Sequence, residues 1–321
     1  MRTLRSKSFR QFGFALSCVL ISGAAAADKQ PLDWLSQMGA AVQSTSYEGT
    51  VIRMKDGTVE ALKVVHTIKD GVVFEKVVAQ EGNGLEIIRT GNEVHCILPD
   101  RKSVLVEEWD DQSTLFSTLP SSDISFGNEY DLAVVRTERV AGREAIMLAI
   151  RPHDGYRYGH RIWLDTETSF PLQTQLINAG TAIEQVKFAE ISLNQEIHAS
   201  ALEPSYSTDQ FTWLRQPSGH VGTTVETTWT SGELPAGFHA IATHEEKMAS
   251  SDEMVTHILF SDGLANVSVF IAANSGDLTE GPAQVGGSNS YSVEHGEFEI
   301  TAIGEVPAIT VEQIASSMRQ P

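Results

Sequence analysis

Side chains that commonly bind metals are scattered along this 321-residue sequence. Its ten histidines include no H-x-H or H-x-x-x-H spacing, and only His239 and His244 come near a ligand spacing. Zinc sites are built from His, Cys and carboxylate ligands at short, regular spacings. The sequence therefore predicts no metal site, and it indicates no cofactor.

Nucleophilic catalysis is not indicated either. The chain has no G-x-S-x-G motif, and Ser261-Asp262-Gly263 is typical of a hairpin turn. Cys96 lies in the apolar run Val94–Leu98, with no neighbouring cation in the sequence to lower its pKa. We therefore expect a buried structural thiol, no catalytic residue and a protein that is not an enzyme.

A cluster of basic residues could recognise an anion. Six arginines lie within 26 positions, at residues 136, 139, 143, 151, 157 and 161. Arginine binds carboxylate and phosphate groups through two parallel hydrogen bonds. Arg136, Arg139, Arg157 and Arg161 are therefore candidate ligand-binding residues. In the alternative interpretation, these arginines are solvated on the outer faces of strands and lie opposite neighbouring acids.

The overall charge excludes one class of partner. The chain has 23 Lys and Arg residues against 42 Asp and Glu residues, with a formal net charge of -19 at pH 7. It would be repelled by the polyanionic backbone of a nucleic acid. The 41% hydrophobic content favours globular cores over disorder.

Residues 1–27 have the features of a cleaved secretory signal peptide. Four cations precede an apolar run, Phe12 to Ile21, which is too short to cross a bilayer. The alanines Ala24–Ala27 then provide a signal-peptidase site. Cleavage leaves Cys96 as the single cysteine, so no intramolecular disulfide can form. The signal is of bacterial type and predicts the periplasm as the location.

Residues 28–204 are expected to form a first domain, a meander of antiparallel strands. The spacing of Leu32, Leu35 and Met38 predicts a short helix, and Val-, Ile- and Thr-rich runs separated by turn pairs follow it.

Some of these strands are apolar on both faces. Ala145–Ile150 is the clearest case, and such a strand requires cover on both sides. The helix and the segment 110–119 would cover one side. The sheet could cover the other by curling into a barrel or half-barrel, and the alternative is a filled sandwich core.

Residues 205–217 are the expected linker, and residues 218–321 the expected second domain. From Ser205 to Pro321 there are three cations against fifteen acids. Ser261-Asp262-Gly263-Leu264 predicts a hairpin between strands 254–260 and 266–272. Thr310-Val311-Glu312-Gln313 has the pattern of a capping box and predicts a final helix. This domain is expected to be small and α+β.

Four stretches of the sequence resemble the periplasmic sigma-E regulators of the RseB/MucB family. They are Tyr156 to Asp165 with Thr168 to Leu172, Gly49-Thr50-Val51, Phe260 to Ile271, and Gly304 to Pro307. The resemblance covers both domains and implies an α+β fold, mainly antiparallel β. The first domain would be a half-open barrel with helices in its mouth, similar to lipoprotein carriers, and the second a smaller α+β domain.

The resemblance also implies a function. Members of this family bind the periplasmic part of a membrane-spanning anti-sigma factor, shield it from site-1 proteolysis, and release it on sensing lipopolysaccharide or other lipid. The alternative hypothesis is a periplasmic lipid or lipoprotein carrier, although a carrier does not need the second domain. Self-association into a homo-oligomer stays open.

The charge of the second domain suggests how it would hold its client, the periplasmic part of the anti-sigma factor. We expect apolar side chains to anchor a cationic segment while acids steer it. The candidate anchors are Phe260, Leu264 and Phe270, and the candidate steering residues are Glu245, Glu246, Asp252 and Glu253. The alternative is that Phe260 and Phe270 are core residues of the hairpin.

Overall fold

The computed structural model describes residues 29–108, 115–116, 119, 127–215, 223–247, 254–274, 276 and 279–320. For Thr223, Glu246 and Lys247 it describes the backbone alone. The expected signal peptide and the candidate residues Asp252 and Glu253 lie outside the described residues.

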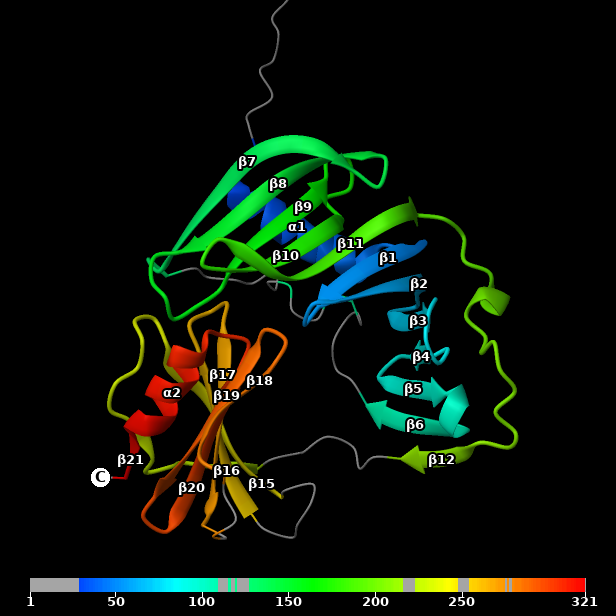
Figure 1. Ribbon diagram of the computed structural model, residues 1–321. Helices are drawn as coiled ribbons and strands as arrows, with labels where there is room; N and C mark the ends of the chain where they lie inside the picture. The colour runs from blue at the N-terminus through cyan, green and yellow to red at the C-terminus, as the bar shows by residue number, and fades with distance from the viewer. Residues whose placement is uncertain are drawn as a thin grey trace, which may run out of the picture.

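Twelve strands of the described chain form one open sheet, which is curved in Figure 1. Its order is β12-β6-β5-β4-β3-β2-β1-β11-β10-β9-β8-β7, and every neighbouring pair is antiparallel except β12 and β6. The strands are β1 (Tyr47–Lys55), β2 (Thr58–Lys69), β3 (Val72–Ala79), β4 (Glu86–Thr90), β5 (Glu93–Leu98), β6 (Ser103–Glu108), β7 (Tyr130–Val140), β8 (Arg143–Pro152), β9 (Gly159–Asp165), β10 (Pro171–Asn178), β11 (Thr181–Leu193) and β12 (Thr212–Arg215).

Tight turns fix the register of this sheet. At Asp56-Gly57 and Asp70-Gly71 both residues of each pair have positive φ, which is the conformation of a two-residue hairpin turn. The helix α1 (Pro31–Ser44) packs on the sheet through Leu35 and Met38, as the spacing predicted. The first-domain strands belong to one curved sheet, so the half-barrel is confirmed and the sandwich alternative is wrong.

The strand β8 is buried on both faces, as its sequence predicted. All six residues from Ala145 to Ile150 are at most 7% exposed. One face joins a cluster with Leu35 and Met38, and Met147 on the other joins a larger cluster around Tyr47, Phe170 and Phe188. Leu115 and Phe116 lie in that larger cluster, so these residues of the segment 110–119 do cover the sheet, but on the face of β8 opposite Leu35 and Met38 and not on the same side as expected.

The second domain has a seven-stranded sheet in the described chain, with the order β13-β15-β16-β17-β20-β19-β18. A two-stranded sheet lies beside it. The helix α2 (Ala308–Ser317) packs one face of the larger sheet through Val311 and Ile314. The strands are β13 (Thr223–Thr224), β14 (Thr230–Ser231), β15 (His239–Lys247), β16 (Met254–Ser261), β17 (Asn266–Ala273), β18 (Gly281–Val285), β19 (Ser288–His295), β20 (Phe298–Gly304) and β21 (Met318–Arg319).

The predicted capping box of the last helix is wrong. The helix begins at Ala308, with Pro307 at its N-cap, so Thr310 lies inside the first turn. Its hydroxyl does not cap the helix but donates to the carbonyl oxygen of Tyr156 in the first domain, at 2.5 Å. The hydroxyl that the local sequence suggested as a cap is therefore used in a contact between the domains.

The segment between the domains is attached to the first sheet. Two short 3-10 helices lie in the first part of the chain, η1 (Pro99–Arg101) and η2 (Ala199–Ala201). After η2, Ser205 donates to the buried carboxylate of Glu86 from its backbone N–H (2.9 Å) and its hydroxyl (2.8 Å). Lys76 pairs with the same carboxylate at 2.9 Å. The chain then pairs with β6 as the edge strand β12.

Candidate functional site at the domain junction

A buried arginine joins the two domains. Arg157 lies between β8 and β9, and its guanidinium donates to Asp262 Oδ2 at 2.8 Å. Both side chains are 0% exposed. The same guanidinium donates to Asp154 (3.1 Å) and to the carbonyl oxygen of Ala236 (2.6 Å). The rings of Tyr130 and Phe238 lie on it at 5.4 and 5.3 Å. All the polar contacts of this cation are therefore made inside the protein.

Asp262 serves the turn and the junction together. Its Oδ1 accepts the backbone N–H groups of Leu264 (2.9 Å) and Ala265 (2.7 Å), which closes the turn between β16 and β17. Its Oδ2 accepts the hydroxyl of Tyr130 at 2.8 Å and the guanidinium of Arg157. Burial, followed by the charge of Asp262, raises the pKa of Tyr130, so this phenol stays a donor. The Ser261-Asp262-Gly263 motif is thus a turn, as predicted.

Two side chains of the second domain contact the chain next to Arg157. Asn289 donates to the hydroxyl of Tyr158 at 3.0 Å and to the carbonyl oxygen of Val306 at 2.7 Å. Thr310 contacts Tyr156 as described above. Three of the stretches that carry the family resemblance therefore meet at this junction.

A pair of carboxyl groups also lies at the junction. Glu184 on β11 accepts the N–H of Gly287 at 2.6 Å and pairs with Lys55 at 3.4 Å. Glu305 of the second domain lines a small pocket with Glu184 and His160. Burial, and then the charge of Glu184, raise the pKa of Glu305 to about 7, against the opposing effect of Lys55. Burial also lowers the pKa of His160 to about 4, so its imidazole is neutral at neutral pH.

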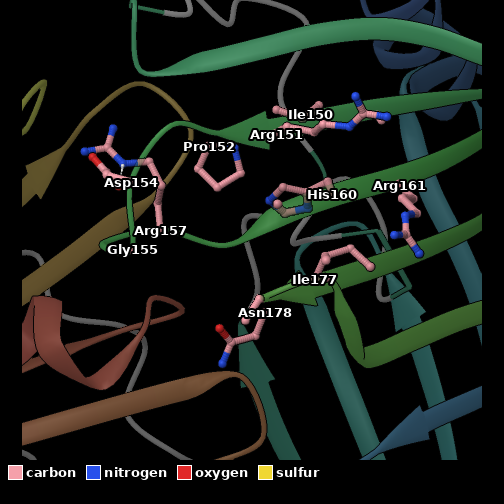
Figure 2. Close-up of a pocket in the computed structure, with 14 residues that line it drawn as sticks. Ile150, Arg151, Pro152, Asp154, Gly155, Arg157, His160, Arg161, Ile177 and Asn178 are labelled. Carbon is pink, nitrogen blue, oxygen red and sulfur yellow. Dashed lines mark hydrogen bonds and ion pairs between the residues drawn. The ribbon is translucent and has the colours of Figure 1, made fainter.

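A larger pocket opens beside the junction, at the ends of β8, β9 and β10. Its volume is about 470 Å³, and all its lining residues belong to the first domain. Figure 2 shows Arg151 and Arg161 at one side of this pocket and Arg157 and Asp154 at the other. Ile177 and Pro152 add apolar surface.

The four candidate ligand-binding arginines do not form one site. Arg139 lies near the turn between β7 and β8, where it pairs in register with Glu144, and Arg136 lies opposite Met147 in the middle of β8. Arg157 and Arg161 lie at the other end of β8, where Ile150 pairs with His160. Five residues of β8, or about 17 Å along the strand, separate the register positions of Arg139 and Arg161, whereas those of Arg136 and Arg161 are two residues apart, on the strands that flank β8. Arg136 pairs with Glu138 at 3.1 Å, as the solvated alternative expected, whereas Arg161 lines the pocket.

The candidate partner-binding residues have different environments. Phe260 is a core residue of the second domain, and Leu264 packs against the α1 cluster of the first domain. Phe270 is half-buried on the sheet face opposite α2, stacked on His257 at 4.4 Å. Glu245 is exposed on β15. The side chain of Glu246 lies outside the described residues, as do Asp252 and Glu253.

Metal-binding and thiol chemistry have no support in the described residues. No group of three or more His, Cys, Asp and Glu side chains in this part of the chain could hold a metal ion. Cys96 is half-buried on β5, and burial raises the pKa of its thiol to about 11. The thiol is therefore protonated at neutral pH and a poor nucleophile.

Sequence reasoning missed most of the junction. Tyr130, Tyr158 and Asn289 carry no motif, and Glu184 and Glu305 are two of many acids. The signal that pointed to the junction was the family resemblance, since three of its four stretches, which hold Arg157, Asp262 and Val306, meet there. No described helix is long and apolar enough to cross a membrane.

The chain is similar to two named regulators along almost its whole length. It is 28% identical to the sigma factor AlgU regulatory protein MucB of Pseudomonas aeruginosa over 294 residues, which cover 89% of this chain and 90% of that protein. It is 27% identical to the sigma-E factor regulatory protein RseB of Escherichia coli K12 over 316 residues, covering 97% and 98%.

Solved structures give the same result. The chain matches the MucB of a complex of Pseudomonas aeruginosa MucA and MucB, with a TM-score of 0.66, 26% identity and coverage of 90% of this chain and 98% of that chain. A crystal structure of MucB with MucA(peri) matches with a TM-score of 0.66, 27% identity and coverage of 91% and 99%. The MucB/RseB N-terminal domain model matches residues 30–206, and the C-terminal domain model matches residues 223–319. This chain belongs to the MucB/RseB family.

Proposed function

We propose that this chain is a periplasmic negative regulator of an envelope-stress sigma factor, which acts by binding the periplasmic segment of a transmembrane anti-sigma factor. The observation that carries the proposal is the match to MucB in complex with MucA(peri), which spans 91% of this chain and includes both domains. By binding this segment, the chain would shield it from site-1 proteolysis. No step of this function requires catalysis.

The second domain offers a surface for such a segment. Its sheet is covered by α2 on one face, where Phe260 is buried, whereas Leu259, Phe270 and Ile303 lie on the opposite face. Ile303 is 43% exposed there. Apolar anchors of this kind supply most of the affinity of an interface, and surrounding charges set the association rate.

The charge of this domain suggests the chemistry of the bound segment. With three cations against fifteen acids after Ser205, it would attract a segment that carries Lys or Arg beside apolar residues. We therefore infer that Phe270 anchors the client and that the acids of the second domain, Glu245 among them, steer it.

Release on sensing lipopolysaccharide or other lipid is a separate part of the proposal. The arrangement of the arginines limits it, because a single lipid head group would not contact all four candidates. Titration of the chain with lipid A and with a dephosphorylated analogue tests whether phosphate is recognised. Equal, undetectable binding of both would count against lipid sensing but leave client binding intact.

Co-purification tests the main proposal. Chain isolated from the periplasm of its own cells should carry the anti-sigma factor with it. A carrier, the second candidate function, would instead carry lipid or lipoprotein and no anti-sigma factor. The presence of a second domain of about 100 residues, matched by its own family model, favours the regulator.

A further inference from the structure

The pocket beside the junction places two arginines on one face of the sheet. Arg161 on β9 pairs in register with Ala149 on β8, and Arg151 lies two residues beyond Ala149 on the same strand. Side chains two residues apart on a strand share a face, and long side chains on such diagonal neighbours reach one another. Figure 2 shows both arginines along the pocket wall.

Two small residues line this pocket beside the arginines. Ala149 and Gly159 lie between the two arginines. A Cβ atom on Gly159 would lie 2.9 Å from the carbonyl oxygen of Ile150 and 3.2 Å from the Pro152 ring, so this position has no room for a side chain. The backbone of Ile150 and the ring of Pro152 therefore pack closely against Gly159.

The two arginines lack an acidic partner. Within the described residues, neither Arg151 nor Arg161 makes an ion pair or a side-chain hydrogen bond, whereas Arg53, Arg136, Arg143, Arg157 and Arg215 all pair with acids. The nearest acids are engaged elsewhere: Asp131, opposite Arg151 in register, pairs with His153 at 3.1 Å, and Asp154 pairs with Arg157 at 3.1 Å. Two adjacent arginines without a direct ion pair form a local site for an external anion. Arg157 is not available to such an anion, because all its polar contacts are internal.

The surroundings favour a monoanion over a dianion. The carboxylate of Asp154 lines the same pocket, and the whole chain is strongly acidic. Both would repel a phosphate dianion more than a carboxylate. Ile177 and Pro152 provide apolar surface for the aliphatic part of the ligand. The volume of about 470 Å³ is within the range of small-ligand pockets.

We propose that this pocket binds the carboxylate of an Asp or Glu side chain on an extended peptide segment, with Arg151 and Arg161 as its two cationic contacts. The choice of a peptide rests on the proposed function, because the pocket includes Arg157, whose ion pair with Asp262 joins the first domain to the second. The client would then carry an acidic residue for this pocket in addition to cations for the second domain.

The test uses short peptides and the whole chain from Asp28 onward. The probe is acetyl-Leu-Glu-Leu-amide, and its neutral match is acetyl-Leu-Gln-Leu-amide. NMR signals of the arginine Nε–H groups report the contact directly. We expect the Glu peptide to shift the Arg151 and Arg161 signals saturably, and the Gln peptide to leave them unchanged. Arg151→Gln or Arg161→Gln should weaken binding about tenfold each, the usual effect of losing one charge-assisted hydrogen bond.

Arg136→Gln is the matched control, because Arg136 is exposed on the same sheet but does not line the pocket, and its guanidinium pairs with Glu138. It should bind the Glu peptide as the unchanged chain does. Equal binding of both peptides would overturn the carboxylate site, and so would the absence of any shift. Tighter binding of inorganic phosphate than of the Glu peptide would overturn the peptide assignment in favour of a phosphate group. None of these outcomes depends on whether the anti-sigma factor binds.

Discussion

The guanidinium of Arg157 and the carboxylate of Asp262 form an ion pair of 2.8 Å between the two domains, and neither side chain is exposed to solvent. Because the carboxylate also closes the turn before β17, the junction and the hairpin depend on the same group. A change in the turn between β16 and β17 would therefore also disturb the contact of the second domain with Arg157.

Removing Arg157 should therefore lower the stability of the chain and of the turn that Asp262 closes. Arg157→Met leaves Asp262 buried without its cation, which typically costs about 3–5 kcal/mol. We expect a lower urea midpoint and faster amide exchange at Leu264 and Ala265, whose N–H groups bond to Asp262. Arg136→Met removes an exposed pair and should change stability by less than about 0.5 kcal/mol. Equal effects of the two substitutions would contradict the conclusion that Arg157 joins the two domains.

The stability of the chain should depend on pH through Glu305. Its pKa is raised to about 7 by burial and by Glu184, from an ordinary value of 4.5. A carboxyl with a raised pKa stabilises the fold when it is protonated, so its contribution is full below pH 4.5 and is lost as pH rises through 7. The loss is on the order of 3 kcal/mol at most.

Denaturant unfolding between pH 4.5 and 8 measures this effect. Glu305→Gln should flatten the decline of stability in this window, because the amide does not ionise. Glu312→Gln changes an exposed residue on α2 and should leave the pH profile as it is. A Glu305→Gln chain with the original profile would show that the ionisation of Glu305 is not coupled to folding.

The attachment of the interdomain segment should depend on Glu86. Its buried carboxylate accepts two hydrogen bonds from Ser205 and pairs with Lys76. Glu86→Ala would leave Lys76 largely buried without its counter-ion and is expected to cost about 3 kcal/mol or more. Limited proteolysis should then cut between residues 203 and 212. Ser205→Ala removes one hydroxyl and should cost about 1 kcal/mol. Resistance of the Glu86→Ala chain to cleavage would refute this attachment.

Substitution of the two phenylalanines of the β16–β17 hairpin should have different effects, one on the stability of the fold and the other on the binding of the anti-sigma segment. Phe260 is 3% exposed in the core, so Phe260→Ala should cost about 3–5 kcal/mol of stability. Phe270 is half-buried on the opposite face, so Phe270→Ala should cost less stability but weaken the binding of the anti-sigma segment by tenfold or more. Calorimetric titration and thermal unfolding of both variants give the comparison. Unchanged affinity for the anti-sigma segment in Phe270→Ala would show that the segment does not bind at Phe270.

Local elements of the fold could be predicted from the sequence. The turn at Ser261-Asp262-Gly263, the two-faced burial of Ala145–Ile150 and the helix near Leu32 all follow from short-range patterns, and the structure confirms them. In each case the physical cause lies within a few residues of the pattern, either in φ preference or in hydrophobic periodicity.

The junction could not be predicted, because its contacts join residues far apart in the chain. Tyr158 and Asn289 are 131 positions apart, and Arg157 and Asp262 are 105 apart. The arginine cluster failed as one site for a related reason. Arg139 lies at the turn of the β7–β8 hairpin and Arg161 near its other end, Arg136 and Arg161 lie on the two strands that flank β8, and Arg157 is held by Asp262.

The central claim is that this chain binds the periplasmic segment of an anti-sigma factor through both domains. Isothermal titration of the chain from Asp28 onward with the purified segment tests it most directly. We predict saturable binding whose affinity falls in Phe270→Ala and also falls as salt rises, since the acidic second domain attracts the segment. No heat of binding, together with no association in a second assay at the same concentrations, would contradict the claim.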